Sequence, residues 1–352
     1  MINPFFDPKD KRVRSLLRIA FCGVLYLVIT VGITLAFGIL IMAFLPSSID
    51  ALRLTDMAAY NEAVNNFYFT TPISGMLTYL GLLLGILAST WLAGRFFDKR
   101  DYVDFGLHFD LQWFKDLAAG ILTGALLMAL VFGVEFIFGF VKITGTLYSS
   151  RPTISFGTGF AEMLFLFFCV GIYEELFFRG YLIKNLAEGF RSKRFSNRTT
   201  ILIAYLISSV VFAAAHMSNV AFNFQALINL ILAGFLLGLA YIWTGELAFP
   251  IGLHMAWNFF QGPVFGFQVS GTIPTETLLA TQVIGPEWVT GGAFGPEGGL
   301  IGSAAILFGI FVIFLYHKYI RKQTTILDEI SNFVPRLTPE ETVNKDSKRR
   351  IQ

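Results

Sequence analysis

The chain is poor in charged residues. Charged side chains make up 14% of its 352 residues, whereas about a quarter of the residues in a soluble domain are charged. Hydrophobic residues account for 55% of the chain, and its mean hydropathy is +0.65. This composition excludes an ordinary soluble domain, so we expect a polytopic membrane protein.

Cysteine is also scarce. The two cysteines, Cys22 and Cys169, both lie in apolar runs, and the sequence contains no CxxC pair. We therefore expect two buried thiols rather than a disulfide framework or a zinc knuckle. The net charge of +2 is small, and the basic residues do not form a concentrated basic face. We therefore expect no nucleic-acid partner.

Long apolar runs predict about eight transmembrane helices. A helix needs roughly 20 apolar residues to cross the hydrocarbon core of a bilayer. The candidate segments are 19–45, 73–94, 117–141, 159–184, 200–217, 225–243, 247–262 and 299–320. The seventh segment is short and is interrupted by His254 and Asn258. We predict an all-α polytopic membrane helix bundle around a polar cavity.

The distribution of positive charge predicts the orientation. The first apolar run is too long for the core of a signal peptide and lacks a small-residue cleavage site. Lys and Arg concentrate before this run, in the loops 95–115 and 191–198, and after His317. By the positive-inside rule both termini are cytoplasmic. We expect an integral, multi-pass protein of a prokaryotic plasma membrane.

The chain divides into four regions. We expect a cytoplasmic segment with three transmembrane helices, then a catalytic core, then an external loop with the last transmembrane helix, and finally a cytoplasmic tail. These regions cover residues 1–158, 159–262, 263–320 and 321–352. The external loop is rich in Gly and Pro and carries Glu276, Glu287 and Glu297, to which the sequence assigns no role.

Three GxxxG pairs lie inside the predicted spans. Small residues at this spacing let two helix backbones approach closely. We expect these pairs to serve packing within the bundle rather than a specific dimer face. The pairs are Gly81–Gly85, Gly120–Gly124 and Gly234–Gly238.

Three polar islands interrupt the apolar segments. Ionisable side chains within bilayer-length segments are costly and generally mark a function. The islands are Glu174-Glu175 with Arg179, Phe212 with His216, and His254 with Asn258. A further acid, Glu135, lies in the middle of the third predicted span, where we expect it to find a structural hydrogen bond.

The first island separates two glutamates. Adjacent residues on a helix point about 100° apart, so Glu174 and Glu175 face different neighbours. Glu175 and Arg179 have the i,i+4 spacing and order that favour an ion pair. This leaves Glu174 as a candidate general base, unless both acids only cap a helix end or bind a neighbouring helix.

The other two islands supply histidine and asparagine. His216 lies one helical turn after Phe212, and Asn258 lies one turn after His254, so each pair shares a helix face. His254 and Asn258 together could donate hydrogen bonds to a developing oxyanion. The alternative for each pair is a polar clamp between helices.

Taken in order, the three motifs resemble those of a known family. Glu-Glu-x-x-x-Arg, then Phe-x-x-x-His, then His-x-x-x-Asn on successive helices resemble the CAAX proteases and bacteriocin-processing enzymes (the CPBP family), and are similar to the CAAX prenyl protease type 2 domain. The resemblance covers roughly residues 160–262. It implies an intramembrane glutamic endopeptidase.

The resemblance also implies a role for each residue. Glu174 would activate the attacking water, and His216 would position that water or share its proton. His254 and Asn258 would stabilise the oxyanion. Glu175, Arg179 and Phe212 would support the site. The implied substrate is a membrane-bound or lipidated peptide, of the prenylated CAAX type in eukaryotic relatives.

Several alternatives stay open at this point. Two histidines and one glutamate form a legitimate catalytic zinc set, so Glu174, His216 and His254 could instead bind zinc, with Glu175 as the base. The sequence contains no HExxH, and we favour a metal-free reaction. A non-catalytic regulator or bacteriocin-immunity-like protein of the same family, or a transporter, would also carry polar residues in membrane helices. The oligomeric state is open.

The depth of the site is a further question. Counted from the preceding cytoplasmic loops, His216 lies about 25 Å along its helix and His254 about 10 Å along its own, at 1.5 Å per residue. The two side chains can meet only if their helices begin at different depths. We expect the fourth and fifth helices to protrude into the cytoplasm.

Overall fold

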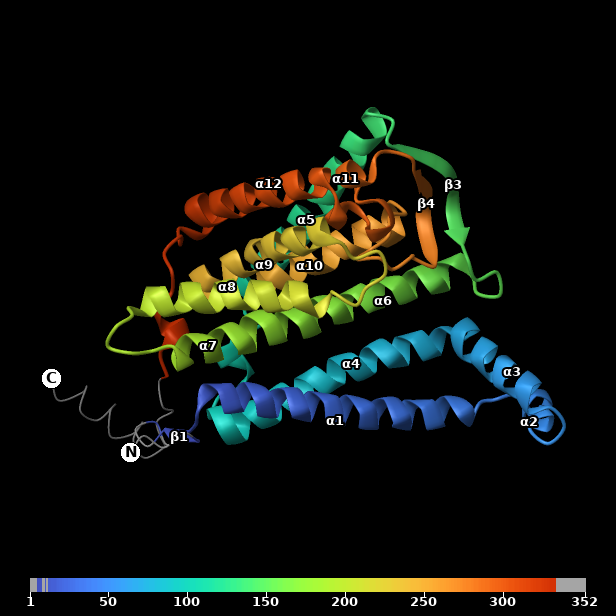
Figure 1. The fold of residues 1–352 in the computed structure, drawn as a ribbon, viewed down its shortest axis with the longest axis horizontal. Coiled ribbons are helices and arrows are strands. Elements are labelled where there is room, and N and C mark those ends of the chain that lie inside the picture. Colours follow the sequence, from blue (N-terminus) through green and yellow to red (C-terminus); the bar gives the residue numbers. More distant parts are fainter. Residues whose placement is uncertain (1–4, 8–9, 11, 334–352) are drawn as a thin grey trace.

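The computed structural model describes residues 5–7, 10 and 12–333 of the chain (Figure 1). Side chains of residues 68–70 and 72–73 are not described. Lys9 and Lys11 of the basic N-terminal segment, and residues 334–352 of the predicted tail, lie outside the described residues. The described chain is mostly helical, and the predicted all-α polytopic bundle is confirmed.

Seven helical segments within the described residues are long and apolar enough to cross a membrane. Three of them are composite, because a π-helical stretch continues the α-helix. The segments are α1 (Ser15–Met42), α4 (Pro72–Ala93) with η1 (Gly94–Asp98), α5 (Leu111–Ile137), α6 (Phe156–Glu175) with η3 (Leu176–Ile183) and α7 (Lys184–Gly189), α8 (Asn197–Ala215), α9 (Phe224–Thr244), and α12 (Leu300–Tyr316) with η7 (His317–Arg321).

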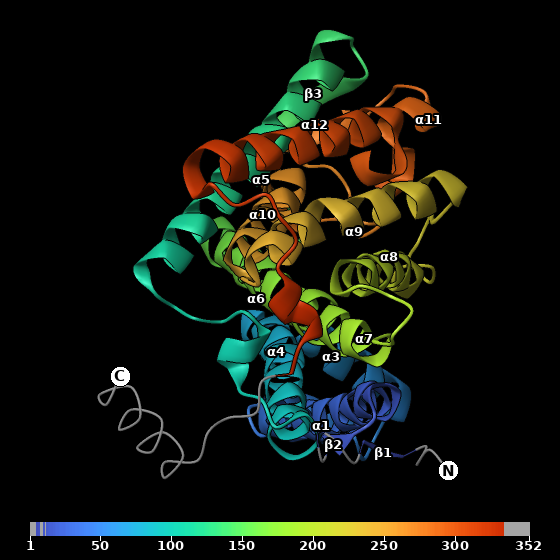
Figure 2. The same cartoon turned by 90° about the vertical axis from the view of Figure 1, so that its left-hand side faces the viewer.

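The seventh predicted segment is short, as the sequence indicated. It forms α10 (Ala248–Phe259), which has 12 residues and continues into the π-helical η4 (Phe260–Val264). By its length α10 is not among the seven helical segments that could cross a membrane. Ten of the 12 residues of α10 are buried, and the helix lies inside the bundle near α5, α6 and α9 (Figures 1 and 2). Because protein surrounds it, α10 does not need the length of a lipid-facing span.

The loops contain more structure than the sequence predicted. Strand β3 (Val141–Ser149) pairs antiparallel with β4 (Glu276–Val283), so the loop after α5 and the predicted external loop form one two-stranded sheet. The remaining short elements are β1 (Phe6–Asp7), β2 (Arg12–Val13), α2 (Ser47–Leu52), α3 (Met57–Thr70), η2 (Tyr102–Phe105), α11 (Glu287–Thr290), η5 (Gly292–Phe294), η6 (Pro296–Gly298) and η8 (Asp328–Ser331).

All three GxxxG pairs face a neighbouring helix of the same chain. A Cβ atom built on Gly120 would lie 2.3 Å from the carbonyl oxygen of Phe249 in α10, and one on Gly124 would lie 2.5 Å from that of Leu253. Gly234 and Gly238 face α8 in the same way, and Gly81 and Gly85 face α1. The expected role in packing within the bundle is confirmed.

Two further expectations concern isolated residues. Cys22 and Cys169 are free and buried, as predicted. Glu135 is fully buried in α5, but neither of its carboxylate oxygens has a hydrogen-bond partner among the described residues. The expected structural hydrogen bond of Glu135 is therefore absent from the described part of the chain.

The contact between α5 and α10 yields a stability prediction. We expect Gly120→Ala to destabilise the protein by about 1–3 kcal/mol, as overpacking generally does, because its new Cβ would meet backbone rather than a flexible side chain. Thermal unfolding in detergent micelles measures the change. Gly133→Ala is the matched control in the same helix, since a Cβ there meets nothing within 4 Å. Equal midpoints for both variants would contradict the prediction.

Candidate active site

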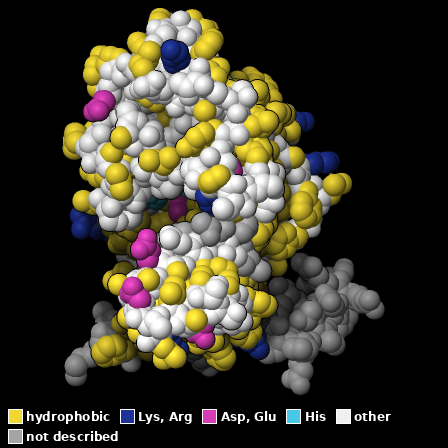
Figure 3. Space-filling view, turned by 90° about the vertical axis from the view of Figure 1, so that its right-hand side faces the viewer, with side chains coloured by type: hydrophobic (Ala, Val, Ile, Leu, Met, Phe, Trp, Pro, Cys, Tyr) yellow, Lys and Arg dark blue, Asp and Glu magenta, His cyan; other side chains and the backbone are white. Residues whose placement is uncertain are grey.

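A cavity of about 570 Å³ lies among the helices. Its lining includes side chains from α1, α4, α6, α8, α9 and α10, and from the segment 269–275 that precedes β4. Glu174, His216, His254 and Asn258 all line this cavity. Figure 3 shows the surface hollowed at the end of the molecule that carries β3 and β4, with acidic and histidine side chains visible in the hollow.

The two adjacent glutamates of α6 face different surroundings. Glu174 faces the cavity, whereas Glu175 is fully buried. Oxygen Oε1 of Glu175 accepts a hydrogen bond of 2.7 Å from Nη1 of Arg179. The same oxygen lies 2.7 Å from Nδ1 of His254. Glu175 therefore links α6 to α10, a link that the sequence did not predict.

This link fixes the tautomer of His254. An ionised carboxylate only accepts hydrogen bonds. Nδ1 of His254 is therefore protonated and donates the hydrogen bond to Glu175. The other ring nitrogen, Nε2, lies 3.9 Å from Oε2 of Glu174. That distance is too long for a direct hydrogen bond, but it allows a single oxygen atom to contact both groups.

The charges of this cluster balance when His254 is protonated. With Glu174 and Glu175 both ionised, Arg179 alone leaves the cluster with one excess negative charge. An unbalanced charge is costly away from water. A second proton on His254, at Nε2, restores neutrality and turns that nitrogen into a hydrogen-bond donor aimed towards Glu174.

His216 also carries a proton on Nδ1, but its Nε2 is unprotonated. It lies at the C-terminal end of α8, where its Nδ1 is 2.8 Å from the carbonyl oxygen of Phe212. A carbonyl can only accept, so Nδ1 donates and a neutral His216 has its lone pair on Nε2. The two histidines are therefore chemically distinct, one a donor and the other an acceptor.

Phe212 separates the two histidines. Its ring centroid lies 4.9 Å from that of His216 and 6.0 Å from that of His254. The guanidinium carbon of Arg179 lies 4.4 Å from the same ring, within the range of a cation–π contact. Phe212 thus contacts residues from three helical segments and excludes water from between them.

Asn258 completes the set on α10. It lies one turn after His254, on the same helix face, and is 6% exposed. Its carboxamide has no hydrogen-bond partner among the described residues. The amide group is therefore available to a ligand in the cavity.

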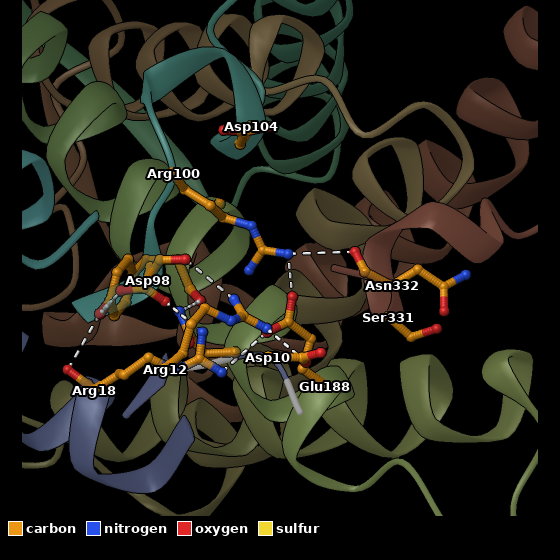
Figure 4. A network of polar contacts seen from close by, with 12 residues as sticks. Asp10, Arg12, Arg18, Asp98, Arg100, Asp104, Glu188, Ser331 and Asn332 are labelled. Atoms are coloured by element: carbon orange, nitrogen blue, oxygen red, sulfur yellow. Dashed lines mark hydrogen bonds and ion pairs between the residues drawn. The ribbon is translucent and has the colours of Figure 1, made fainter. Parts of the chain in front are cut away.

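A polar cluster fixes the other end of the helix that carries Glu174 (Figure 4). Oε2 of Glu188 in α7 accepts hydrogen bonds from Arg12 at 3.1 Å and from Arg18 at 2.9 Å, and its Oε1 accepts one from Arg100. Arg18 also donates to Asp98 at 2.8 Å. The cluster joins α7 to the N-terminal segment and to the end of α4.

The composite helix 156–189 is longer than a bilayer core. It has 34 residues, which corresponds to about 50 Å at 1.5 Å per residue, against about 30 Å of hydrocarbon. That the fourth helix protrudes into the cytoplasm stays a prediction from its length. His216 and His254 face the same cavity although their distances along their helices differ.

Several cavity residues escaped the sequence analysis. Tyr26 of α1 and Tyr79 of α4 line the cavity, but tyrosines in apolar helices give no distinctive signal. Asn219 and Ser270 belong to loops whose positions depend on the fold. Glu297 was noted only as a charge in the external loop. Of these residues, only Asn219 has a recognisable signal, as a polar side chain in the short turn between two apolar helices, α8 and α9.

The zinc alternative requires three converging donors. Within the described residues, no three His, Cys, Asp or Glu side chains are grouped so that they could bind one metal ion. Glu174, His216 and His254 line the cavity without forming such a set. We therefore derive no step through a metal, and the metal-free reaction stays a prediction.

Comparison with known proteins identifies part of the chain. Residues 156–260 match the family model described as type II CAAX prenyl endopeptidase Rce1-like. The match begins with α6 and ends just after α10, so it includes all three motifs. No curated protein and no solved structure matches the chain. The resemblance to CAAX proteases is confirmed, and residues 156–260 form a domain of the Rce1-like, type II CAAX prenyl endopeptidase family.

Proposed function

We propose that this protein is an intramembrane endopeptidase that hydrolyses a peptide bond in a membrane-associated or prenylated polypeptide. The observation that carries the proposal is that a carboxylate, an acceptor histidine, a donor histidine and a carboxamide line one cavity. The family match supports a peptidase of the CAAX-protease type. The prenylated substrate rests on the family alone.

Glu174 and His216 activate the attacking water. Glu174 accepts a proton from water as the water attacks the carbonyl carbon of the scissile bond. Nε2 of His216 accepts the second hydrogen bond of that water and so orients its lone pair. A protonated Glu174 then returns its proton to the leaving nitrogen. General-base catalysis of this kind contributes about 10²–10⁴-fold.

Two residues of α10 stabilise the oxyanion. The carbonyl oxygen becomes negatively charged in the tetrahedral intermediate, and donors positioned in advance stabilise it most effectively. His254, protonated at Nε2, and the amide of Asn258 are two such donors on one helix face. Glu175 keeps His254 oriented and charged, so we regard Glu175 and Arg179 as positioning residues.

The rival functions use fewer of these features. A non-catalytic regulator would not need a base, a donor histidine, an acceptor histidine and an unpaired amide in one cavity. A transporter would need a polar pathway through the bundle, whereas the cavity lining is largely apolar around these few polar groups. The cytoplasmic location of both termini stays a prediction from the distribution of Lys and Arg.

The base has a direct test. We expect Glu174→Gln to lower kcat by about 10²–10⁴, the usual contribution of a general base, because the amide is nearly isosteric but cannot accept the proton of water. The measurement is turnover of a membrane-associated peptide by the purified protein. Glu62→Gln, an exposed change in α3, is the matched control.

Near-normal turnover by the Glu174→Gln protein would rule out Glu174 as the base. Exhaustive chelation of the wild-type protein separates the metal-free reaction from the zinc alternative. Activity that survives chelation supports the proposal. Activity that is lost on chelation and restored by zinc would overturn the metal-free part of it.

The oxyanion role is tested separately. We expect Asn258→Ala to lower kcat by about 10²–10³, the loss seen on removal of one oxyanion donor, with little change in KM. Asn61→Ala, at an exposed position of α3, controls for the loss of an asparagine. A raised KM with unchanged kcat would instead assign Asn258 to ground-state binding of the substrate.

A further inference from the structure

One carboxylate in the cavity has no part in the proposed chemistry. Glu297 lies in η6, between α11 and α12, and lines the same cavity as Glu174. It is 6% exposed. It lies beyond the end of the family match at residue 260, so the resemblance says nothing about its role.

Glu297 is held through only one of its two oxygens. Oε2 accepts hydrogen bonds from the backbone nitrogen of Ser270 at 2.8 Å and from its hydroxyl at 2.7 Å. Oε1 has no hydrogen-bond partner among the described residues. The side chain is thus fixed in position while one of its oxygens is left for a ligand.

Two backbone segments, at Gly295 and at Gln268, lie very close together next to this contact. Gly295 has φ +98°, and a Cβ atom there would lie 2.1 Å from the carbonyl oxygen of Gln268. Ser270 has φ +48°, a region that residues other than glycine rarely adopt. Glu297 accepts from both donors of Ser270 and so stabilises this conformation.

A short hydrogen-bonded path connects Glu297 to the catalytic residues. The backbone nitrogen of Asn219 donates to the carbonyl oxygen of His216 at 3.0 Å. Its side-chain amide donates to the carbonyl oxygen of Ser270 at 3.0 Å, and Ser270 in turn donates to Glu297. Ser270 and Asn219 therefore link Glu297, which lines the cavity, to the backbone of His216.

The charge of the cavity favours a cation. Its lining contains two carboxylates, Glu174 and Glu297, against one protonated histidine, His254, and no lysine or arginine, so its net charge is negative. A lining of one sign raises the local concentration of ligands of the opposite sign.

The rim next to the cavity is acidic as well. Arg151 donates hydrogen bonds to Glu276 and, at 2.8 Å, to Glu162, so two carboxylates share one guanidinium group. Burial raises the pKa of Glu276, but hydrogen bonds from Arg151, Thr275 and Ser149 outweigh it and hold this pKa below its ordinary value. Glu276, which directly follows the cavity residue Thr275, is therefore ionised at neutral pH.

We propose that Glu297 binds a lysine or arginine side chain of the polypeptide substrate, close to the bond that is cut. A charged hydrogen bond to a carboxylate that is shielded from water is stronger than a neutral one. The cavity would therefore select membrane-associated polypeptides with a basic residue near the cleavage site. The inference rests on the proposed function for the identity of the ligand as a polypeptide.

The test measures binding rather than turnover, in the Glu174→Gln background. The probes are palmitoylated, fluorescently labelled eight-residue alanine peptides that carry one lysine at each position in turn, or glutamine at the same position. Fluorescence anisotropy with the full-length protein in detergent gives the dissociation constants. At one or two positions we expect the lysine peptide to bind about tenfold more tightly than its glutamine counterpart, as one charged hydrogen bond allows.

Glu297→Gln, added to the Glu174→Gln protein, should reduce the preference for the lysine peptide over the glutamine peptide to within about twofold. The reason is that the one charged contact to the lysine is lost. Glutamine can still accept from Ser270, so the loop keeps its anchor. Glu287→Gln is the matched control, because it removes a charge from the same loop at an exposed position outside the cavity lining. That variant should keep the full preference.

The outcomes separate the two proposals. A lysine preference that Glu297→Gln does not change would overturn the inference, and so would an equal loss of affinity for lysine and glutamine peptides. Neither result depends on cleavage. If the preference depends on Glu297 but the wild-type protein cleaves none of the peptides that it binds, the binding site stands and the proposed peptidase activity fails.

Discussion

The candidate site depends on one buried carboxylate. Oε1 of Glu175 accepts from Arg179 within its own helical segment and from His254 in α10, and these contacts hold the base-bearing helix against the oxyanion-bearing helix. Breaking a buried pair by removing one partner generally costs about 3–5 kcal/mol, because the other charge is left without compensation. Glu175 therefore determines the geometry, the tautomer and the charge of the site together.

A short helix can carry half of this site because backbone packing surrounds it. Gly120 and Gly124 let α5 approach the backbone of α10 closely, and Gly252 of α10 approaches Leu117 in return. At 12 residues, α10 is too short to act as a lipid-facing span, and its position is set by its protein neighbours. His254 and Asn258 are consequently held on an element that has little freedom to move.

Local patterns were sufficient to predict much of this structure. Apolar runs predicted the helices, and the i,i+4 spacings predicted the Glu175–Arg179 pair and the shared faces of the histidine motifs. Contacts between distant segments could not be predicted in this way. Glu175 and His254 are 79 residues apart, β3 pairs with β4 across four helical segments, and Glu297 reaches the cavity only through the turn at Gly295. The length of α10 and the unpaired carboxylate of Glu135 likewise depend on what surrounds them.

The central claim is that Glu175 acts on catalysis through His254, and a double-mutant cycle tests it directly. The measurement is kcat/KM for the wild-type protein, Glu175→Gln, His254→Gln and the double variant, with folding checked by thermal unfolding. If Glu175 acts only by orienting and charging His254, the double variant should be no slower than His254→Gln alone, because residues that act as a unit are not additive. Losses that multiply in the double variant would show independent roles and contradict the account.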